Sequence, residues 1–426
     1  LSRRDSQTEA RDVRTVHRLA PRGIVRAVSP ALRIHALGLA ALGAITSILM
    51  VTPVLPLDLD RRGLPPSHVG AVVGIMSLAL VFTEVLASTA TARIGRRRAG
   101  LIAFAGSAVM LASFPSVTSL WGLYMNRAIF GAVRGLLWPV MFAEVADAAP
   151  AERRGHAFAT FWLYFGLGQL IGPALGGWLG DRVSLAAPFY AAAALSFLAI
   201  PTAFAIRPQR DPATGNPLTA FRELFRRAPA VPRTWALTSC NVIVFSVYAT
   251  FLPLHAASRG LSAGAIGLIF TGGALAFIVG QDLLRRLGHR LSAERFLIPA
   301  FLARGLGVAA TPFLPSFGPL LLANAATGVL GAAIPNALTT RIANQAPRTL
   351  LVAAMGGFNA SADLGFFLGP VVGGALAGTA LRWAFLMVVP VTAAALVLLL
   401  RQQPVGHHRG EEQGEIGHGV SEQPDR

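Results

Sequence analysis

The stretch Gly168-Gln-Leu-Ile-Gly172-Pro173-Ala-Leu-Gly176-Gly177 lies in a long apolar segment and returns later as Gly365-Phe-Phe-Leu-Gly369-Pro370-Val-Val-Gly373-Gly374. Both copies read G-x-x-x-G-P-x-x-G-G, and matching positions are 197 residues apart, from 172 to 369. Glycines at i, i+4 and i+8 leave one side of a helix bare, so that a neighbouring helix can approach to backbone contact. Such a glycine- and proline-containing helix is unstable in water but tolerated in a membrane. The repeat therefore predicts a helical membrane protein built from two related halves.

The composition of the chain also indicates a membrane protein. Of its 426 residues, 54% are hydrophobic and only 13% are charged, whereas a soluble protein carries about 25% charged residues. The net charge of +17 comes with arginines clustered between apolar segments, which is the positive-inside pattern and does not indicate a nucleic-acid partner. The single cysteine, Cys240, excludes intrachain disulfides and cysteine-based metal clusters, and we expect no metal site.

Twelve apolar segments are long enough to cross a bilayer, which takes about 20 residues. We expect spans near 34–56, 68–91, 99–118, 120–143, 157–179, 187–206, 234–256, 263–284, 294–314, 318–342, 351–378 and 381–400. An even number of spans places both termini on one side, and the arginine-rich loops predict that this side is the cytoplasm. The expected organisation is a cytoplasmic tail (1–33), a six-helix half (34–206), a cytoplasmic linker (207–233), a second six-helix half (234–401) and a disordered cytoplasmic tail (402–426).

A basic turn follows the second span and returns after the eighth. The copies are Ala92-Arg93-Ile94-Gly95-Arg96-Arg97-Arg98 and Arg285-Arg286-Leu287-Gly288-His289-Arg290. The first copy resembles the G-x-x-x-D-R-x-G-R-R/K turn of the major facilitator superfamily, although Ser88 replaces the leading glycine and Ala92 the acid. The resemblance extends over about 34–400. It implies the major facilitator fold, an all-α integral membrane protein with twelve transmembrane helices in two six-helix halves.

The resemblance also implies a cytoplasmic gate, with acids from the end of span four in place of the missing aspartate. Its candidate residues are Arg93, Gly95, Arg96, Arg97, Glu144 and Asp147. Simple solvated charges are the alternative interpretation.

The fourth span contains Arg127-Ala-Ile-Phe-Gly131-Ala-Val-Arg134-Gly135, which resembles the family's R-x-x-x-G pattern associated with proton coupling. An unpaired guanidinium in hydrocarbon costs at least about 2.5 kcal/mol, so this helix face should line a wet cavity or meet carboxylates. The carboxylates available within spans are Glu84 and Asp363. We expect one of them to carry a proton, with Arg127 or Arg134 as its partner; a static buried ion pair is the alternative.

Polar and aromatic residues within spans are candidates for the substrate cavity, namely Trp138, Asn241, Tyr248, Asn336 and Asn359. Asparagines in spans also serve as hydrogen-bonding contacts between helices. Arg304 in the ninth span is expected nearer a flank, where its long side chain can reach the membrane surface.

The chain contains no H-E-x-x-H motif and no nucleotide-binding loop, so we do not expect an enzyme. The family resemblance implies a transporter without cofactors that uses the proton gradient. The glycine-proline stretch in span five is similar to that of the family's antiporters and favours export. We expect a monomer in the cell membrane that exports small amphiphilic compounds, such as drugs or secondary metabolites. A proton-coupled importer of a small metabolite and a non-transporting membrane sensor remain alternatives, and the charge of the substrate stays open.

Overall fold

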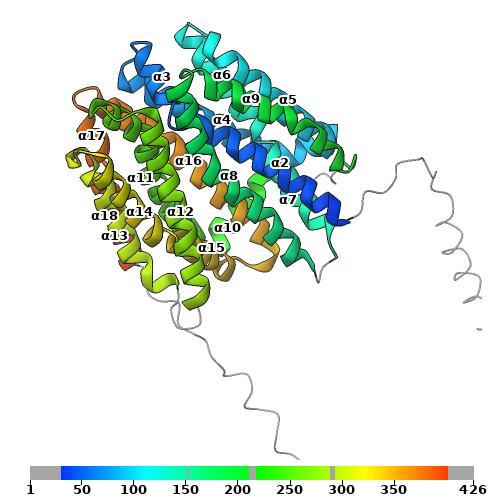
Figure 1. Cartoon of the computed structure of the whole chain (residues 1–426). Helices are drawn as coiled ribbons and strands as arrows, with labels where there is room; N and C mark the ends of the chain where they lie inside the picture. Colours follow the sequence, from blue (N-terminus) through cyan, green and yellow to red (C-terminus); the bar gives the residue numbers. More distant parts are fainter. Residues whose placement is uncertain (1–29, 151–152, 211–216, 288–292, 402–426) are drawn as a thin grey trace, which may run out of the picture.

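The computed structural model describes residues 30–150, 153–210, 217–287 and 293–401 (Figure 1), and the regular structure in these ranges is helical throughout. The helices before the linker are α2 (Pro30–Val51), α3 (Leu55–Arg61), α4 (Pro66–Ile94), α5 (Arg96–Ser113), α6 (Leu120–Arg134), α7 (Leu137–Ala148), α8 (Arg154–Arg182) and α9 (Ala187–Leu198). They form the first half.

The linker contributes the short helix α10 (Pro217–Arg227), whose Phe221 and Phe225 rings pack against Trp235. The second half consists of α11 (Ala230–Ser258), α12 (Ala263–Leu287), α13 (Leu297–Ala310), α14 (Phe317–Gly331), α15 (Ala333–Gln345), α16 (Leu351–Ala377), α17 (Leu381–Leu386) and α18 (Val388–Leu400). Short 3-10 turns extend several of these helices.

Twelve apolar segments of the described chain match the twelve spans expected from the sequence. By length and composition, 11 of them can cross a membrane, and Leu297–Phe313 is a shorter apolar helix at the position of the ninth span. The first span includes α3 and ends at Arg61, because the turn at 52–54 is short and hydrogen-bonded to the last residues of α2. At the other end of α4, Gly95 has a φ of 84°, a backbone conformation that favours glycine and lets α5 begin at once.

The fourth and tenth spans are both broken in the middle. The fourth span divides into α6 and α7, and the tenth into α14 and α15. Pro139 and Pro335 each stand at the third position of the second piece, where a missing N–H and a rigid ring oppose an unbroken helix. The breaks therefore follow from matching prolines in the two halves.

The first three glycines of each motif copy pack against the first helix of their own half. Gly172 and Gly176 face Leu49 and Met50 of α2, and a methyl group at Gly176 would overlap the Met50 backbone. In the second copy, Gly365, Gly369 and Gly373 face α11 in the same way. The bare stripe predicted from the sequence thus holds α2 against α8 and α11 against α16.

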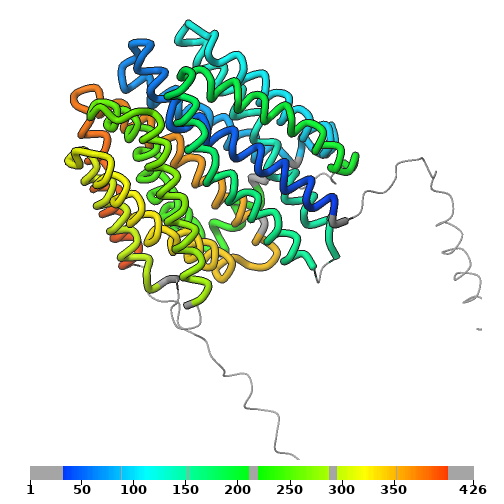
Figure 2. The backbone as a smooth tube through the Cα atoms, in the orientation of Figure 1, coloured from blue at the N-terminus to red at the C-terminus, as the bar shows by residue number. Residues whose placement is uncertain are grey.

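The last glycine of each copy joins the two halves, whose backbone is traced in Figure 2 from blue at the N-terminus to red at the C-terminus. A methyl carbon on Gly374 would lie 3.3 Å from the Cα of Gly70 in α4, and one on Gly177 would lie 3.0 Å from the Cα of Gly267 in α12. Gly70 and Gly267 are themselves 197 residues apart. The halves therefore meet through two equivalent glycine contacts, which we call the closed end of the molecule.

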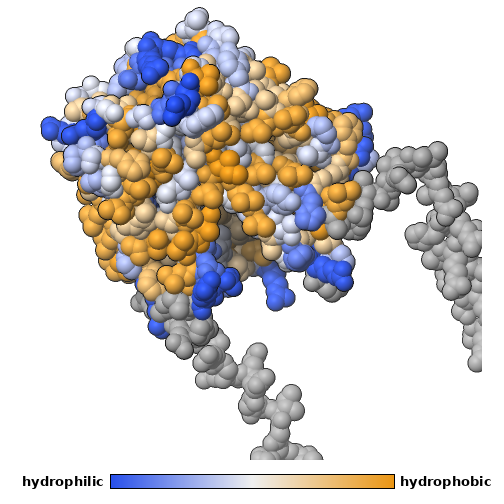
Figure 3. All heavy atoms as spheres, viewed as in Figure 1, coloured by the Kyte–Doolittle hydropathy of each residue, from blue (hydrophilic) through white to orange (hydrophobic). Residues whose placement is uncertain are grey.

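Apolar side chains cover the middle of the face shown in Figure 3, and hydrophilic side chains gather at its upper and lower edges. This distribution is that of a protein whose waist faces lipid. A hollow opens at the lower edge of this face.

Candidate functional site

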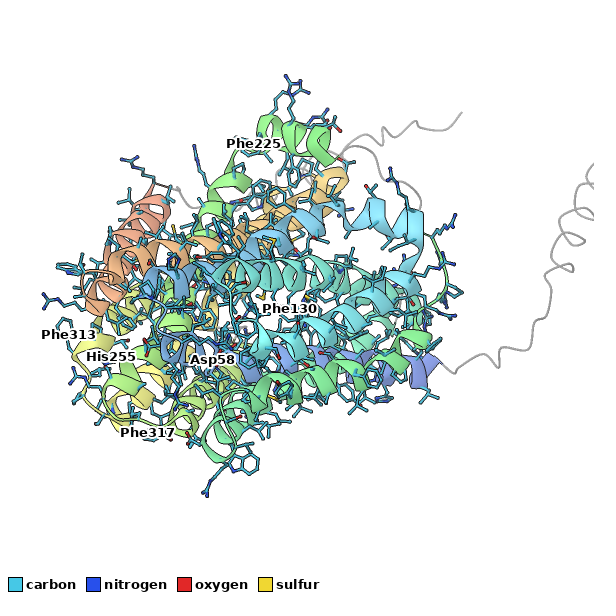
Figure 4. All side chains as sticks on the ribbon, turned by 90° about the horizontal axis from the view of Figure 1, so that it is seen from above. Asp58, Phe130, Phe225, His255, Phe313 and Phe317 are labelled. Carbon is cyan, nitrogen blue, oxygen red and sulfur yellow. The ribbon has the colours of Figure 1, made fainter. Side chains whose placement is uncertain are left out.

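A cavity of about 550 Å³ lies between the halves and is lined by residues of both. Its wall is mainly aromatic and aliphatic, and Phe130 of α6 lies in the interior of the bundle (Figure 4). The aromatic residues of the wall are Phe130, Trp138, Phe165, Phe245, Tyr248, Phe270, Phe277 and Phe366. A pocket of this size and composition suits an organic molecule with a sizeable apolar body.

Two carboxyl groups meet where α4 packs against α16. Glu84 of the first half and Asp363 of the second are hydrogen-bond partners, and Asp363 lines the cavity. A hydrogen bond between two carboxyl groups requires that one of them carry a proton, because an ionised carboxylate only accepts. The sequence presented these residues as alternatives, and the structure brings them together.

Arg127 of α6 lines the cavity and is only 6% exposed. Its Nη2 lies 3.2 Å from the Met76 sulfur, its guanidinium sits 5.1 Å from the centre of the Phe130 ring, and its buried Nε has no hydrogen-bond partner among the described residues. Gly131, one turn further along, lets α6 approach the backbone of α4 at Met76. This glycine of the R-x-x-x-G pattern thus helps to place Arg127 at the cavity wall.

Arg134 lies deeper and is not part of the cavity wall. It is 1% exposed, its Nη1 donates to the Ala44 carbonyl at 3.3 Å, and it contacts the Phe130 ring as Arg127 does. Within the described part of the chain, no ion pair joins Arg127 or Arg134 to Glu84 or Asp363. The expected pairing of an arginine with a proton-carrying acid is therefore not seen in this conformation.

Arg304 of α13 lines the cavity, so the expectation that it lies near a flank is wrong. Its Nη1 donates to Asn241 Oδ1 at 2.8 Å, and its guanidinium lies 5.6 Å from the Phe245 ring centre. A methyl carbon at Gly331 would lie 2.6 Å from Arg304 Nη2, so the absent side chain at Gly331 leaves room for the guanidinium. The sequence contains the glycine, but nothing in the local pattern says that it faces Arg304.

The structure divides the other cavity candidates. Trp138 and Tyr248 line the cavity, whereas Asn241, Asn336 and Asn359 are outside its wall. Asn241 still acts on the wall through its bond to Arg304, and Asn336 donates to Gln281 Oε1 at 2.6 Å.

The charged residues at the junction of α4 and α5 form a cluster within the first half. The fully buried Glu144 pairs with Arg33 and, at 3.2 Å, with Arg96, and it accepts a bond from the Arg207 backbone N–H. Asp147 pairs with Arg96 at 2.7 Å.

Two other residues of this basic turn contact the end of the first half and the start of the linker. Arg97 donates to the carbonyl of Ile206, Gly95 lies beside Gln209, and Arg93 is exposed. In this conformation the cluster therefore ties together helix ends of one half, and its expected role as a gate between halves stays a prediction.

Comparison with known proteins adds a family to this geometry. The model of the Major Facilitator Superfamily matches residues 37–263 and 234–423. The multidrug resistance protein MdtG of Klebsiella pneumoniae is 26% identical over 85% of this chain and 89% of its own length. The quinolone resistance protein NorA of Staphylococcus aureus is 24% identical over 82% of this chain and 91% of its own.

A shorter match and a solved structure complete the comparison. The class C tetracycline resistance protein of Escherichia coli is 33% identical, over only 38% of this chain and 41% of its own. The crystal structure of the nucleoside transporter NupG superposes with a TM-score of 0.71 at 14% identity, covering 87% of this chain and 98% of NupG. At this identity the superposition establishes the fold alone.

Proposed function

The chain belongs to the Major Facilitator Superfamily of membrane transporters, and we propose that it exports small amphiphilic compounds in exchange for protons, by alternating access. The observation that carries the proposal is the Glu84–Asp363 carboxyl pair, which links the two halves beside the cavity. A group that holds a proton at the interface of the halves can couple proton movement to their rearrangement.

The carboxyl pair supplies a physical coupling between charge and conformation. While one proton is held, the hydrogen bond joins α4 to α16. When that proton leaves, two like charges face each other in an apolar environment, and their repulsion favours separation of the helices. Proton release and uptake therefore favour different arrangements of the two halves.

Export is supported by the names of the relatives, since MdtG and NorA are resistance proteins that match along most of the chain. An amphiphilic cargo is supported by the aromatic wall of the cavity, which is interrupted by only a few charged groups. We further propose that the protein lies in the cell membrane with both termini in the cytoplasm, because arginines concentrate in the loops on that side. The proton gradient takes the place of a cofactor.

The test is efflux from a host that lacks its own drug exporters, across cationic, neutral and anionic fluorescent compounds, with and without a protonophore. Cells with the transporter should retain less of at least one compound, and the protonophore should abolish the difference. Glu84→Gln and Asp363→Asn should each lower gradient-driven efflux at least about tenfold, roughly 1.4 kcal/mol in coupling, while purified Glu84→Gln still binds the compound. The exposed Asp60→Asn variant, away from the cavity, is the matched control.

The same assay separates the competing functions. Gradient-driven accumulation of a compound would identify an importer, and binding without flux for every compound would identify a sensor. Wild-type efflux by both Glu84→Gln and Asp363→Asn would refute the role of the carboxyl pair.

A further inference from the structure

The cavity wall contains more cationic than acidic side chains, and these charged side chains come from both halves. Arg127 belongs to the first half and Arg304 to the second, and Asp363 is the acid that lines the cavity with them. The wall therefore presents two cationic groups and one acidic group to the cavity. The acidic group, Asp363, is hydrogen-bonded to Glu84. An organic ligand in the cavity faces all three.

From this arrangement, and building on the proposed export function, we propose that the substrate is a zwitterionic amphiphile. Its carboxylate is bound by Arg127 and Arg304, and its cationic group is received at Asp363. The apolar body of the molecule occupies the aromatic part of the cavity.

We infer the carboxylate of the substrate from the two arginines of the cavity wall. Arg127 is buried, its Nε has no hydrogen-bond partner among the described residues, and its Nη2 contacts the Met76 sulfur at 3.2 Å. Arg304 bonds to the neutral oxygen of Asn241, so among the described residues neither guanidinium is neutralised by an acid. A buried uncompensated guanidinium is unfavourable in a membrane, and a carboxylate matches the planar arrangement of its N–H donors.

We infer the cationic group of the substrate from the proposed exchange of substrate for protons. In an antiporter the proton and the substrate must weaken each other's binding, and such coupling is reciprocal. A purely anionic molecule beside Asp363 would instead favour the protonated carboxyl pair, so that proton and substrate would bind together. A cationic group at Asp363 competes with the proton shared with Glu84. Only a molecule that carries both charges satisfies the arginines and also excludes the proton.

Three dyes on one xanthene skeleton test the proposal by equilibrium binding. Rhodamine 110 carries a delocalised cation and a carboxylate, rhodamine 123 is its methyl ester, and fluorescein keeps the carboxylate but lacks the cation. Affinities for the purified full chain in detergent at neutral pH are measured by fluorescence polarisation. We expect rhodamine 110 to bind at least about tenfold more tightly than either of the other dyes.

The variants assign each preference to its residue. Arg127→Gln and Arg304→Gln should bring the rhodamine 110 to rhodamine 123 affinity ratio close to one, and Arg127→Lys and Arg304→Lys should keep part of it. Asp363→Asn should remove the preference over fluorescein. Arg382→Gln, at the exposed start of α17, should change neither ratio. If Arg304→Gln does not yield monodisperse protein, Gly331→Ala replaces it, because the added methyl displaces the Arg304 guanidinium.

Equal affinity for rhodamine 110 and rhodamine 123, or a ratio unchanged in both arginine variants, would overturn the carboxylate site. Tighter binding of fluorescein than of rhodamine 110 would overturn the cation site. These measurements use no proton gradient, so they judge the binding proposal even if the protein does not export. Conversely, gradient-driven efflux of rhodamine 123 without any preference for rhodamine 110 would leave the export function intact and refute this inference.

Discussion

At the scale of single residues, the buried carboxylate of Glu144 compensates the charge of the arginines around it. Its side chain is completely buried and contacts Arg33, Arg96 and the backbone N–H of Arg207. Replacing it with glutamine keeps the shape but leaves two buried guanidinium groups with less compensating charge. Breaking a buried ion pair in this way costs about 3–5 kcal/mol. We therefore expect Glu144→Gln to lower the unfolding midpoint of the purified protein strongly, as measured by thermal denaturation in detergent.

Asp147→Asn is the matched control for this prediction. Asp147 pairs with Arg96 as well, but its side chain is 36% exposed, and exposed pairs contribute about 0–1 kcal/mol. A loss of stability in Asp147→Asn equal to that in Glu144→Gln would contradict the burial argument.

The sequence identified single residues of the site better than it identified their partners. A charge within an apolar span is energetically costly, so the sequence alone marks Glu84, Asp363 and Arg127 as candidates. The contact between Glu84 and Asp363 cannot be predicted from the sequence, because the two residues lie in different halves and meet only through the packing of α4 on α16. The position of Arg304 was not predictable either, because the space for its guanidinium is left by Gly331 on another helix.

At the scale of helices, two glycines of α8 differ in what surrounds them. Gly177 contacts α12 of the other half at the closed end, whereas a methyl group at Gly166 would meet nothing within 4 Å. Gly177→Ala should therefore push α8 away from α12 and destabilise the closed end, lowering transport at least about tenfold. Gly166→Ala should leave transport intact and raise stability by up to about 1 kcal/mol through helix propensity.

Efflux rate and unfolding midpoint, measured together on the two glycine variants, test this assignment. Similar effects of Gly166→Ala and Gly177→Ala on efflux would show that the contact with α12 is not what makes Gly177 necessary.

Helix positions were predictable to a large extent because each span has to cross the bilayer with apolar residues. The division of single spans into two helices was harder to predict from the sequence. The breaks at Pro139 and Pro335 became clear only from the paired helices α6–α7 and α14–α15. Proline is tolerated within membrane helices, so its presence alone does not tell a bend from a break.

At the scale of the whole molecule, the two halves share their packing but differ in their charges. The glycine pairs at the closed end obey the spacing of 197 residues, whereas the positions equivalent to Glu84 and Asp363 are Gln281 and Gly166. The carboxyl pair therefore exists at the α4–α16 contact and has no counterpart at the α8–α12 contact. In the proposed mechanism these two equivalent contacts open, and the single acid pair makes one of them responsive to protons.

The closed end carries one further link between halves, which allows its movement to be tested directly. At the end of α8, Asp181 Oδ2 accepts hydrogen bonds from Ser262 Oγ at 2.6 Å and from the Gly264 N–H at 2.8 Å. In a Cys240→Ser background, cysteines at 181 and 262 should form a disulfide under mild oxidation. If the closed end must open during each cycle, this cross-link should abolish efflux, and a reductant should restore it.

The control for this cross-link joins two helices of one half. Ser47 and Ser196 lie 3.2 Å apart through their Oγ atoms, on α2 and α9, and cysteines at these positions should cross-link without stopping efflux, because alternating access moves the halves as units. Full efflux with the 181–262 disulfide formed, as verified by the shifted mobility of a protein cleaved in the linker, would mean that the α8–α12 contact does not open. Transport would then have to proceed through separation of α4 from α16 alone, at the contact that holds the Glu84–Asp363 pair.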